Sequence, residues 1–193
     1  MLGLKLPTDP RWVNLVDKSI EEILTDHAYC EQKAASSGIS LIINYPELEE
    51  LVEEVSKVVD EEWGHFRLVL DELKKRNLKL GRLRKDDYVN ALQKKIKNNG
   101  TYEELLLDKL LMCALIEARS CERFKLLSLQ CSDLDLREFY KKLMVSEAGH
   151  YKLFLDFAYK YIDEEKVDKR WQFFLDTEAE VMQSIAYRGD RMH

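Results

Sequence analysis

The sequence has little of what turns and extended segments require: it contains only 7 glycines and 3 prolines among 193 residues. Charged residues make up 34% of the chain, and leucine, glutamate and lysine are abundant. Strong helix formers with few helix breakers favour an all-α fold. A chain of this length can bury the core of one ordinary domain, so we expect a single domain spanning residues 1–193.

Further absences exclude several kinds of site. The four cysteines contain no Cys-x-x-Cys pair, which argues against zinc ribbons and rubredoxin-type iron sites, and their scattered positions are unlike a disulfide framework. The sequence has no apolar leader segment at its start and no apolar run long enough to cross a bilayer, so we expect a cytoplasmic protein without membrane contact. The net charge of −6 argues against a uniformly basic nucleic-acid binder.

Two short stretches repeat one another, and both read Glu-x-Gly-His-aromatic. One places Glu62 and His65 three residues apart, and the other does the same with Glu147 and His150. Residues i and i+3 of a helix share a face, so each stretch aims a carboxylate and an imidazole at one point. A lone Glu-x-x-His pair is usually a solvated surface pair, but two matched pairs that use two of only four histidines indicate metal ligation.

A lone glutamate precedes each pair at nearly the same spacing: Glu31 lies 31 residues before Glu62, and Glu117 lies 30 before Glu147. The residues around Glu117 are largely apolar, where a carboxylate is costly unless it is paired or bound to metal. Four carboxylates and two imidazoles from four helices are the ligand set of a ferritin-like di-iron or di-manganese bundle, and such ligands disfavour zinc and copper. The candidate metal ligands are Glu31, Glu62, His65, Glu117, Glu147 and His150.

Apolar periodicity and capping residues predict five main helices. We expect the first helix to end at Ser36-Ser37-Gly38, followed by an extended apolar link over residues 39–45. Thr101 and Glu104 form a capping box at the start of the third helix. A stretch over residues 77–100, with a short helix over 86–97, is long enough for the crossover of a ferritin-like bundle. The helices are expected over residues 12–36, 46–76, 101–130, 133–161 and 164–187.

The expected fold class is therefore an all-α, ferritin-like four-helix bundle with a long crossover between helices two and three and an additional C-terminal helix. The spacing in the second hairpin supports the site independently. Glu117 lies 13 residues before Gln130, and Glu147 lies 14 after Asp133. At about 1.5 Å rise per residue both arms are roughly 20 Å long, so the two carboxylates reach the same height.

Other residues near the motifs have two interpretations each. His27 is either a partner of the nearby lone glutamate or a buried histidine of the core. Glu61 and Glu122 either hydrogen-bond near the metals or face solvent. Gly64 and Gly149 lower helix stability, which indicates either the close approach of another helix or a ligand, or tight helix packing alone.

The stretch between residues 74 and 97 has ten basic residues against two acidic ones, a local charge of +8 in a chain of −6. A basic segment on an acidic protein is either an electrostatic footprint for a polyanion such as RNA or a solvated crossover loop. Tyr88 lies within the stretch and is a candidate for stacking on an unpaired base. The candidate RNA-binding residues are Lys79, Arg82, Arg84, Lys85, Lys94 and Lys95.

A carboxylate-rich di-iron site allows several reactions, some of which the sequence disfavours. Val69 stands where a ribonucleotide reductase small subunit has its radical tyrosine, and the Cys-x-x-Cys module of rubrerythrin-like peroxidases is absent. His150 argues against storage-type ferritin sites, although bacterioferritin-type sites keep this histidine. Two alternatives to oxygen insertion stay open: another ferritin-like di-iron oxidase or ferroxidase that does not act on RNA, and a binding module in which metals only stabilise the fold.

Residues 6–8, 26–35 and 117–124, together with both repeated stretches, carry a family resemblance. The sequence resembles the tRNA 2-methylthio-N6-isopentenyladenosine hydroxylases over nearly its whole length. The resemblance implies a non-haem di-iron, O2-dependent monooxygenase that hydroxylates the isopentenyl group of this modified adenosine beside the tRNA anticodon. It also implies two iron ions, tRNA as a partner and an unidentified electron-transfer partner as external donor. The six candidate ligands match the family's ligands one by one.

Overall fold

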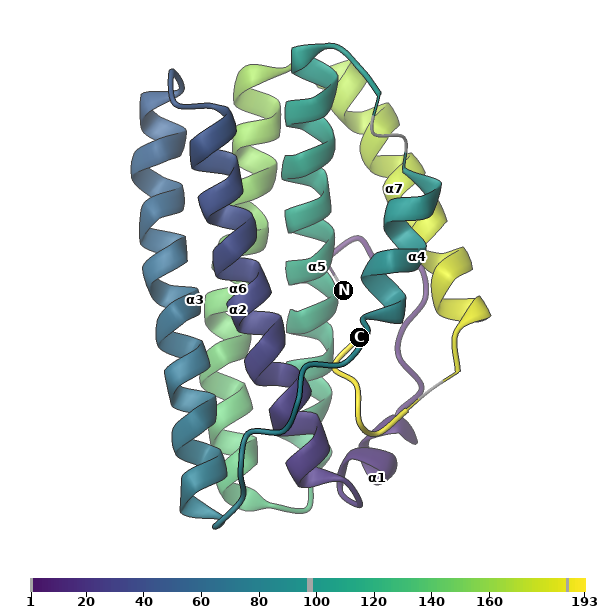
Figure 1. Cartoon of the computed structure of the whole chain (residues 1–193). Helices are drawn as coiled ribbons and strands as arrows, with labels where there is room; N and C mark the ends of the chain where they lie inside the picture. Colours follow the sequence, from purple (N-terminus) through teal and green to yellow (C-terminus); the bar gives the residue numbers. More distant parts are fainter. Residues whose placement is uncertain (1, 97–98, 187) are drawn as a thin grey trace. The chain divides into compact units, whose positions relative to one another are not determined.

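The structure, a computed structural model, describes residues 2–96, 99–186 and 188–193. Over these residues the chain forms seven helices and no strand, so the predicted all-α class is confirmed (Figure 1). No described helix combines the length and the apolar character that a bilayer crossing needs. The helices are α1 (Trp12–Val16), α2 (Ile20–Asn44), α3 (Glu49–Lys75), α4 (Asp87–Lys95), α5 (Tyr102–Gln130), α6 (Leu134–Tyr161) and α7 (Glu164–Ser184).

Contacts between residues group the chain into two compact units. One unit consists of residues 1–13, 85–187 and 193, and it contains α4 to α7. The other consists of residues 14–84 and 188–192, and it contains α2 and α3. Each unit has one long hairpin, α2–α3 in the second unit and α5–α6 in the first (Figure 1).

The α2–α3 hairpin differs from the sequence prediction at its turn. The predicted helix end at Ser36-Ser37-Gly38 and the extended link over residues 39–45 are wrong, because α2 continues to Asn44. Gly38 is buried on the side of α2 that faces α3, and a Cβ atom there would lie 2.6 Å from Cγ2 of Val59. This glycine therefore permits close packing of the two helices instead of ending one of them.

The beginning of the predicted first helix is also interrupted. Residues 12–16 form the separate helix α1, which a turn closes where the Ser19 N–H donates to the Val16 carbonyl at 2.8 Å. Trp12, Val13 and Val16 are buried, so this short helix is held by packing. The polar residues 17–19 separate it from α2.

Side-chain caps begin the helices of the first unit, as predicted. Thr101 and Glu104 form the expected capping box of α5, with 2.8 Å between the Thr101 N–H nitrogen and Glu104 Oε2. Asp133 caps α6 by accepting the Leu136 N–H at 3.1 Å. The predicted short helix is α4, which packs against α7; its expected end at residue 97 lies outside the described residues.

Candidate metal centre

The four candidate glutamates lie at one level of their hairpins. Glu31 lies 13 residues before the last residue of α2, and Glu62 lies 13 residues after the first residue of α3. The same count separates Glu117 from the end of α5 and Glu147 from the start of α6. At about 1.5 Å rise per residue, each carboxylate lies about 20 Å from its hairpin turn. The two glutamates of each hairpin therefore face one another.

In the second unit, α2 and α3 bring Glu31, Glu62 and His65 together. Each offers a ligand atom within 4.8 Å of the others, and all three residues are buried. His65 Nδ1 lies 3.6 Å from Glu31 Oε2 and 3.8 Å from Glu62 Oε2. The sequence prediction that these three residues share one site is confirmed within this unit.

Burial and mutual charge shift the protonation of this triad. Burial lowers the pKa of His65, but hydrogen bonds from its ring to Glu31 and Glu62 and their negative charges outweigh it and raise the pKa to about 10. Burial, followed by the charge of Glu62, raises the pKa of Glu31 well above its ordinary value. The metal-free triad therefore holds protons near neutral pH, and a metal ion would displace them.

His27 lies one turn before Glu31 on α2 and is fully buried. Its Nε2 atom is 2.5 Å from Glu31 Oε1. Burial, and then the positive charge of His65, lowers the pKa of His27 to about 3, so the ring is neutral at pH 7. A neutral ring with its proton on Nε2 donates to the carboxylate and orients it. Of the two sequence interpretations, the structure supports the partner of Glu31.

In the first unit, α5 and α6 bring Glu117, Glu147 and His150 together. Each offers a ligand atom within 4.8 Å of the others, and their exposed fractions are 4%, 3% and 4%. Cys121 lies one turn after Glu117, and its thiol donates to the Met144 carbonyl at 3.4 Å. Burial, with the charge of Glu117, raises the pKa of Cys121 to about 11, which keeps the thiol protonated.

The donor sets fit a hard divalent metal in both units. Each triad offers two carboxylates and one imidazole, all buried, and none of the six residues is a thiol. Oxygen-rich donors with one imidazole per ion suit Fe²⁺ or Mn²⁺ better than zinc or copper. Burying carboxylates in this way is costly unless cations accompany them. The buried Glu/His clusters therefore indicate a di-metal site.

The two other candidate glutamates separate in the structure. Glu61 is exposed, which agrees with its solvent-facing interpretation. Glu122 is buried, and its two carboxylate oxygens accept from the Thr8 backbone N–H at 2.9 Å and the Thr8 hydroxyl at 2.6 Å. Glu122 therefore anchors the segment before α1 to α5.

Arg119 is a residue whose importance the sequence analysis missed. Its guanidinium is fully buried two residues after Glu117, and it has an acceptor for each of its five N–H groups. The only sequence signal was a charged residue in a largely apolar stretch of α5. The acceptors are Glu178 Oε1 (2.9 Å from Nε and 2.6 Å from one terminal nitrogen), the Leu6 carbonyl (2.8 Å), Glu122 Oε2 (2.9 Å) and Thr8 Oγ1 (3.2 Å).

The glycines of the repeated stretches have no packing role among the described residues. A Cβ atom added at Gly64 or Gly149 would meet nothing within 4 Å. Tight helix packing within the described chain therefore does not explain them. Close approach of a molecule outside the chain is the interpretation that stays open.

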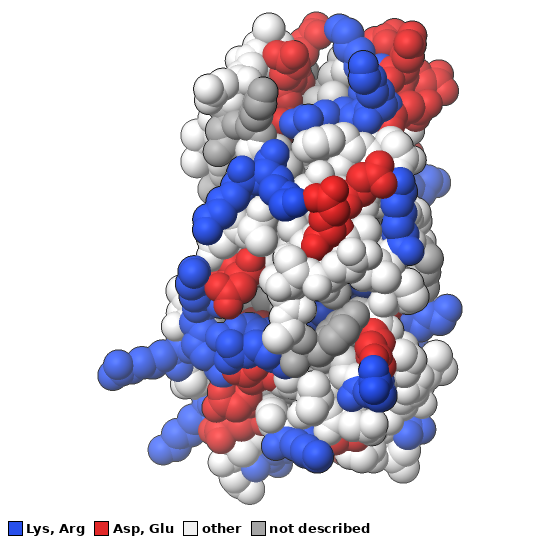
Figure 2. All heavy atoms as spheres, turned by 90° about the vertical axis from the view of Figure 1, so that its right-hand side faces the viewer, with Lys and Arg blue, Asp and Glu red and all other residues white. Residues whose placement is uncertain are grey.

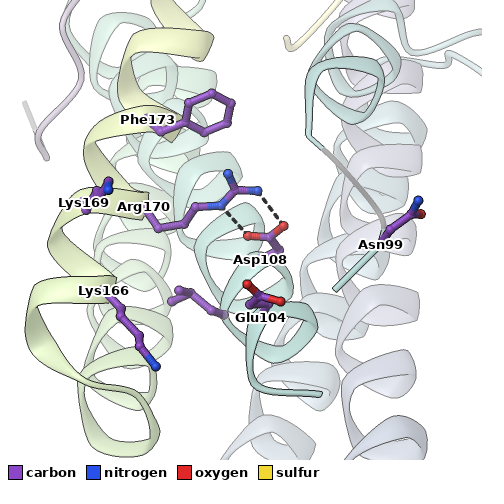
Figure 3. A pocket seen from close by; sticks show the side chains of 8 residues that line it. Asn99, Glu104, Asp108, Lys166, Lys169, Arg170 and Phe173 are labelled. Atoms are coloured by element: carbon purple, nitrogen blue, oxygen red, sulfur yellow. Dashed lines mark hydrogen bonds and ion pairs between the residues drawn. The ribbon is translucent and has the colours of Figure 1, made fainter. Parts of the chain in front are cut away.

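The largest described hollow of the first unit lies between α5 and α7, with a volume of about 420 Å³ (Figure 3). Lys166, Lys169 and Phe173 of α7 face Glu104 and Asp108 of α5 across it. Arg170 points into the hollow and binds Asp108 through two hydrogen bonds of 2.7 Å. Because opposite charges here neutralise one another and no metal-ligand triad lines it, this hollow is not the candidate site.

The predicted RNA-binding residues fall into two groups. Lys79, Arg82 and Lys94 are exposed, and the described residues give their side chains no ion pair. The other three are paired: Lys85 with Asp87 (3.4 Å), Lys95 with Glu180 (2.5 Å) and Arg84 with Glu22 and Asp190. On the face that α4 and α7 present, lysines and arginines alternate with carboxylates (Figure 2).

Tyr88 is not available to stack on a base, contrary to its interpretation from the sequence. It is 1% exposed, and its hydroxyl donates to Glu178 Oε1 at 3.2 Å. Its ring stacks on His193 with 5.3 Å between centroids, and His193 Nε2 lies 2.9 Å from the Ser120 hydroxyl. Tyr88 therefore anchors α4 to the core of the first unit.

Comparisons with known proteins agree with this site. The sequence profile of the family described as tRNA-(ms2io6A)-hydroxylase (MiaE) matches residues 2–193. The tRNA 2-(methylsulfanyl)-N(6)-isopentenyladenosine(37) hydroxylase of Pseudomonas putida is 35% identical over 94% of this chain and 87% of its own length. The enzyme of the same description from Salmonella typhimurium is 29% identical over 94% of this chain and 84% of its own length.

A solved structure, described as a protein with aldehyde deformylating oxygenase activity from Synechococcus, is 33% identical to this chain. It matches with a TM-score of 0.91 and covers 98% of this chain and 94% of its own. This likeness, together with the buried carboxylate and histidine clusters, confirms the ferritin-like class that the sequence predicted. From the match over its whole length and the 35% identical relative, the chain belongs to the tRNA-(ms2io6A)-hydroxylase (MiaE) family of tRNA-modifying enzymes.

Proposed function

We propose that this protein is a di-iron monooxygenase that uses O2 to hydroxylate the isopentenyl group of 2-methylthio-N6-isopentenyladenosine in tRNA. Family membership and the described activity of the two relatives support this substrate. The observation that carries the proposal is the matched pair of buried Glu-Glu-His triads, one in each hairpin and each at the same distance from its turn.

We assign both triads to one dinuclear centre. Glu31, Glu62 and His65 would supply the ligands of the second unit. Iron is favoured over manganese because the proposed reaction uses O2. The same ligand types recur in each hairpin in the same order, which supports one ion per triad with carboxylates shared between the ions. The ligands from the first unit would be Glu117, Glu147 and His150.

Two iron ions held there would supply the redox chemistry that activates O2 for insertion into a C–H bond. Hydroxylation places one oxygen atom in the C–H bond and releases the other as water. The balance requires two electrons and two protons, so an external electron-transfer partner must deliver the electrons. Binding, positioning and the exclusion of bulk water are left to the protein.

Several residues of this chain perform those tasks. His27 stays neutral and donates its Nε2 proton to Glu31, which fixes the orientation of that carboxylate. The six ligands have exposed fractions of 8% or less, which keeps bulk water away from them. The Cys121 thiol stays protonated, so it does not compete as a thiolate ligand.

For the tRNA, we propose that Lys79, Arg82 and Lys94 contact backbone phosphates. Their exposed side chains have no competing carboxylate among the described residues, and phosphate contacts provide most of the affinity of such proteins. Arg84, Lys85 and Lys95 belong to the same basic stretch, but each is already paired with a carboxylate.

The test is to incubate iron-loaded, reduced protein with O2 and tRNA that carries the isopentenylated adenosine, and then to analyse the nucleosides. Oxygen-18 from O2 should appear in the hydroxylated product. Glu62→Ala should remove activity and lower the iron content, whereas Glu61→Ala, at the exposed neighbouring position, should do neither. Absence of hydroxylated nucleoside from fully iron-loaded protein would refute the proposal.

A second candidate function comes from the Synechococcus structure, whose description names aldehyde deformylating oxygenase activity. An enzyme of that kind would consume a long-chain aldehyde and leave tRNA unchanged. The same iron-loaded preparation, given an aldehyde in place of tRNA, separates the two functions. Aldehyde loss without nucleoside hydroxylation would favour this second candidate.

A further inference from the structure

Three arginines surround one carboxylate in the second unit. Arg188 donates from Nε and from a terminal nitrogen to the two oxygens of Asp190, both at 2.9 Å. Arg84 and Arg191 each donate to Asp190 Oδ2 at 3.0 Å. Their effect is visible in the carboxylate itself, since the hydrogen bonds from Arg188 lower the pKa of Asp190 although burial opposes the shift.

This cluster combines a segment from the middle of the chain with residues 188–191. Arg84 lies in the connection between α3 and α4, inside the basic stretch of the sequence. Arg84 is also bound by Glu22, and Arg191 lies 3.9 Å from Asp26. Asp190 is the one carboxylate that all three guanidinium groups share.

Contacts that do not involve Asp190 hold residues 188–192 in place. Gly189 lies so close to α1 that a Cβ atom there would be 2.3 Å from the backbone of Leu15. Met192 is fully buried, and its backbone N–H donates to Asp26 Oδ2 at 2.7 Å. Asp190 is therefore not needed as the sole attachment of this segment.

The cluster remains accessible from solvent. The side chain of Arg188 is 51% exposed, that of Arg84 is 25% exposed, and that of Asp190 is 22% exposed. Planar guanidinium groups bind carboxylate and phosphate oxygens in the same paired geometry, so a group that holds one can hold the other. Three guanidiniums around a single negative charge leave capacity for a second anion or for a replacement.

We propose that Arg84, Arg188 and Arg191 form a binding site for a phosphodiester group of RNA, and that Asp190 takes the place of the phosphate in the free protein. The inference rests on the proposed function only in naming tRNA as the source of the phosphate. It extends the RNA-binding surface to residues 188–191, which the basic stretch of the sequence does not include.

The decisive variant is Asp190→Asn, which keeps the size of the side chain and removes its charge. Kd for an anticodon stem–loop RNA should fall about fivefold at low salt, and the dependence of log Kd on log salt should steepen by about 0.7 to 0.9, one phosphate contact. The matched control is Asp9→Asn, which also removes one charge and frees one arginine, because Asp9 binds Arg11 alone at the surface. Asp9→Asn should change Kd less than twofold.

Arg188→Gln is the second variant, chosen because this side chain is half exposed and its loss should not disturb folding. It should weaken RNA binding several-fold and flatten the salt dependence by about one contact. Unchanged or weaker binding by Asp190→Asn, or an effect of Arg188→Gln no larger than that of the control, would overturn the site. RNA binding that is absent from the wild-type protein would instead count against the proposed function. All measurements use the full chain, with helix content followed by circular dichroism.

Discussion

Replacing Arg119 by methionine should destabilise the first unit more than any other single substitution of a charged side chain outside the metal ligands. The variant keeps the apolar stem of Arg119 and removes all five N–H groups. Glu178 and Glu122 would then keep their negative charges in a buried setting without the cation that now binds both. The exposed fraction of Glu178 is 0%, so solvent cannot replace the lost donors.

The magnitude follows from the burial of the pair. Removing one member of a buried, hydrogen-bonded ion pair is destabilising by about 3 to 5 kcal/mol. A folded domain has a total stability of about 5 to 15 kcal/mol, so the variant should lose a large part of it. Arg119→Lys should lie between methionine and wild type, because an ammonium offers three donors to the acceptors that five now satisfy.

The assay is urea denaturation followed by far-ultraviolet circular dichroism. The matched control is Arg170→Met, because Arg170 also binds a carboxylate through two hydrogen bonds, but on the surface. The control should lose about 1 kcal/mol or less. A loss for Arg119→Met that is no greater than that of the control would show that the buried network is not what holds these elements together.

Four further substitutions or conditions test other features. Gly149→Ala should raise the free energy of unfolding by about 0.5 to 1 kcal/mol, because a Cβ atom there meets nothing; a lower melting temperature would contradict this. Gly38→Ala should destabilise by about 1 to 3 kcal/mol in the same assay, since its Cβ atom would lie 2.6 Å from Val59. His65 has a folded-state pKa of about 10 against an ordinary 6.5, so its protonated form should stabilise metal-free protein fully below pH 6.5, and thermal melts should show that contribution disappearing as the pH rises toward 10. Thr101→Ala should cost about 0.5 to 2 kcal/mol in chemical denaturation through loss of the capping box, and an unchanged midpoint would refute that role.

The sequence predicted most of the fold because its helices begin with polar caps and carry regular apolar faces. Thr101 and Asp133 marked two starts that the structure confirms. Gly38 misled, because a glycine after two serines has the pattern of a helix end, while its actual role is contact with a helix that comes later in the chain. Such a long-range contact leaves no local signal. The organisation as a single domain stays a prediction.

The two triads could be predicted because the motif is local: Glu62 and His65 share a helix face whatever the tertiary structure. Their lone partners could be predicted because the hairpin arms have matching lengths. The supporting residues could not. Arg119 and Glu178 are 59 residues apart, and Arg84 and Asp190 are 106 apart, so neither pair has a spacing that periodicity can detect. The assignment of the six ligands to one centre stays a proposal.

The equal arms of the hairpins limit where evolution can add or remove residues. One residue inserted between Glu31 and the end of α2 would turn the carboxylate by about 100° around the helix axis, because an α-helix has about 3.6 residues per turn. Insertions in the connection between α3 and α4, or beyond the outer ends of the hairpins, carry no such penalty. Length differences among members of this family should therefore be confined to those segments, and a gap inside any of the four arms would mark a protein that has lost the metals.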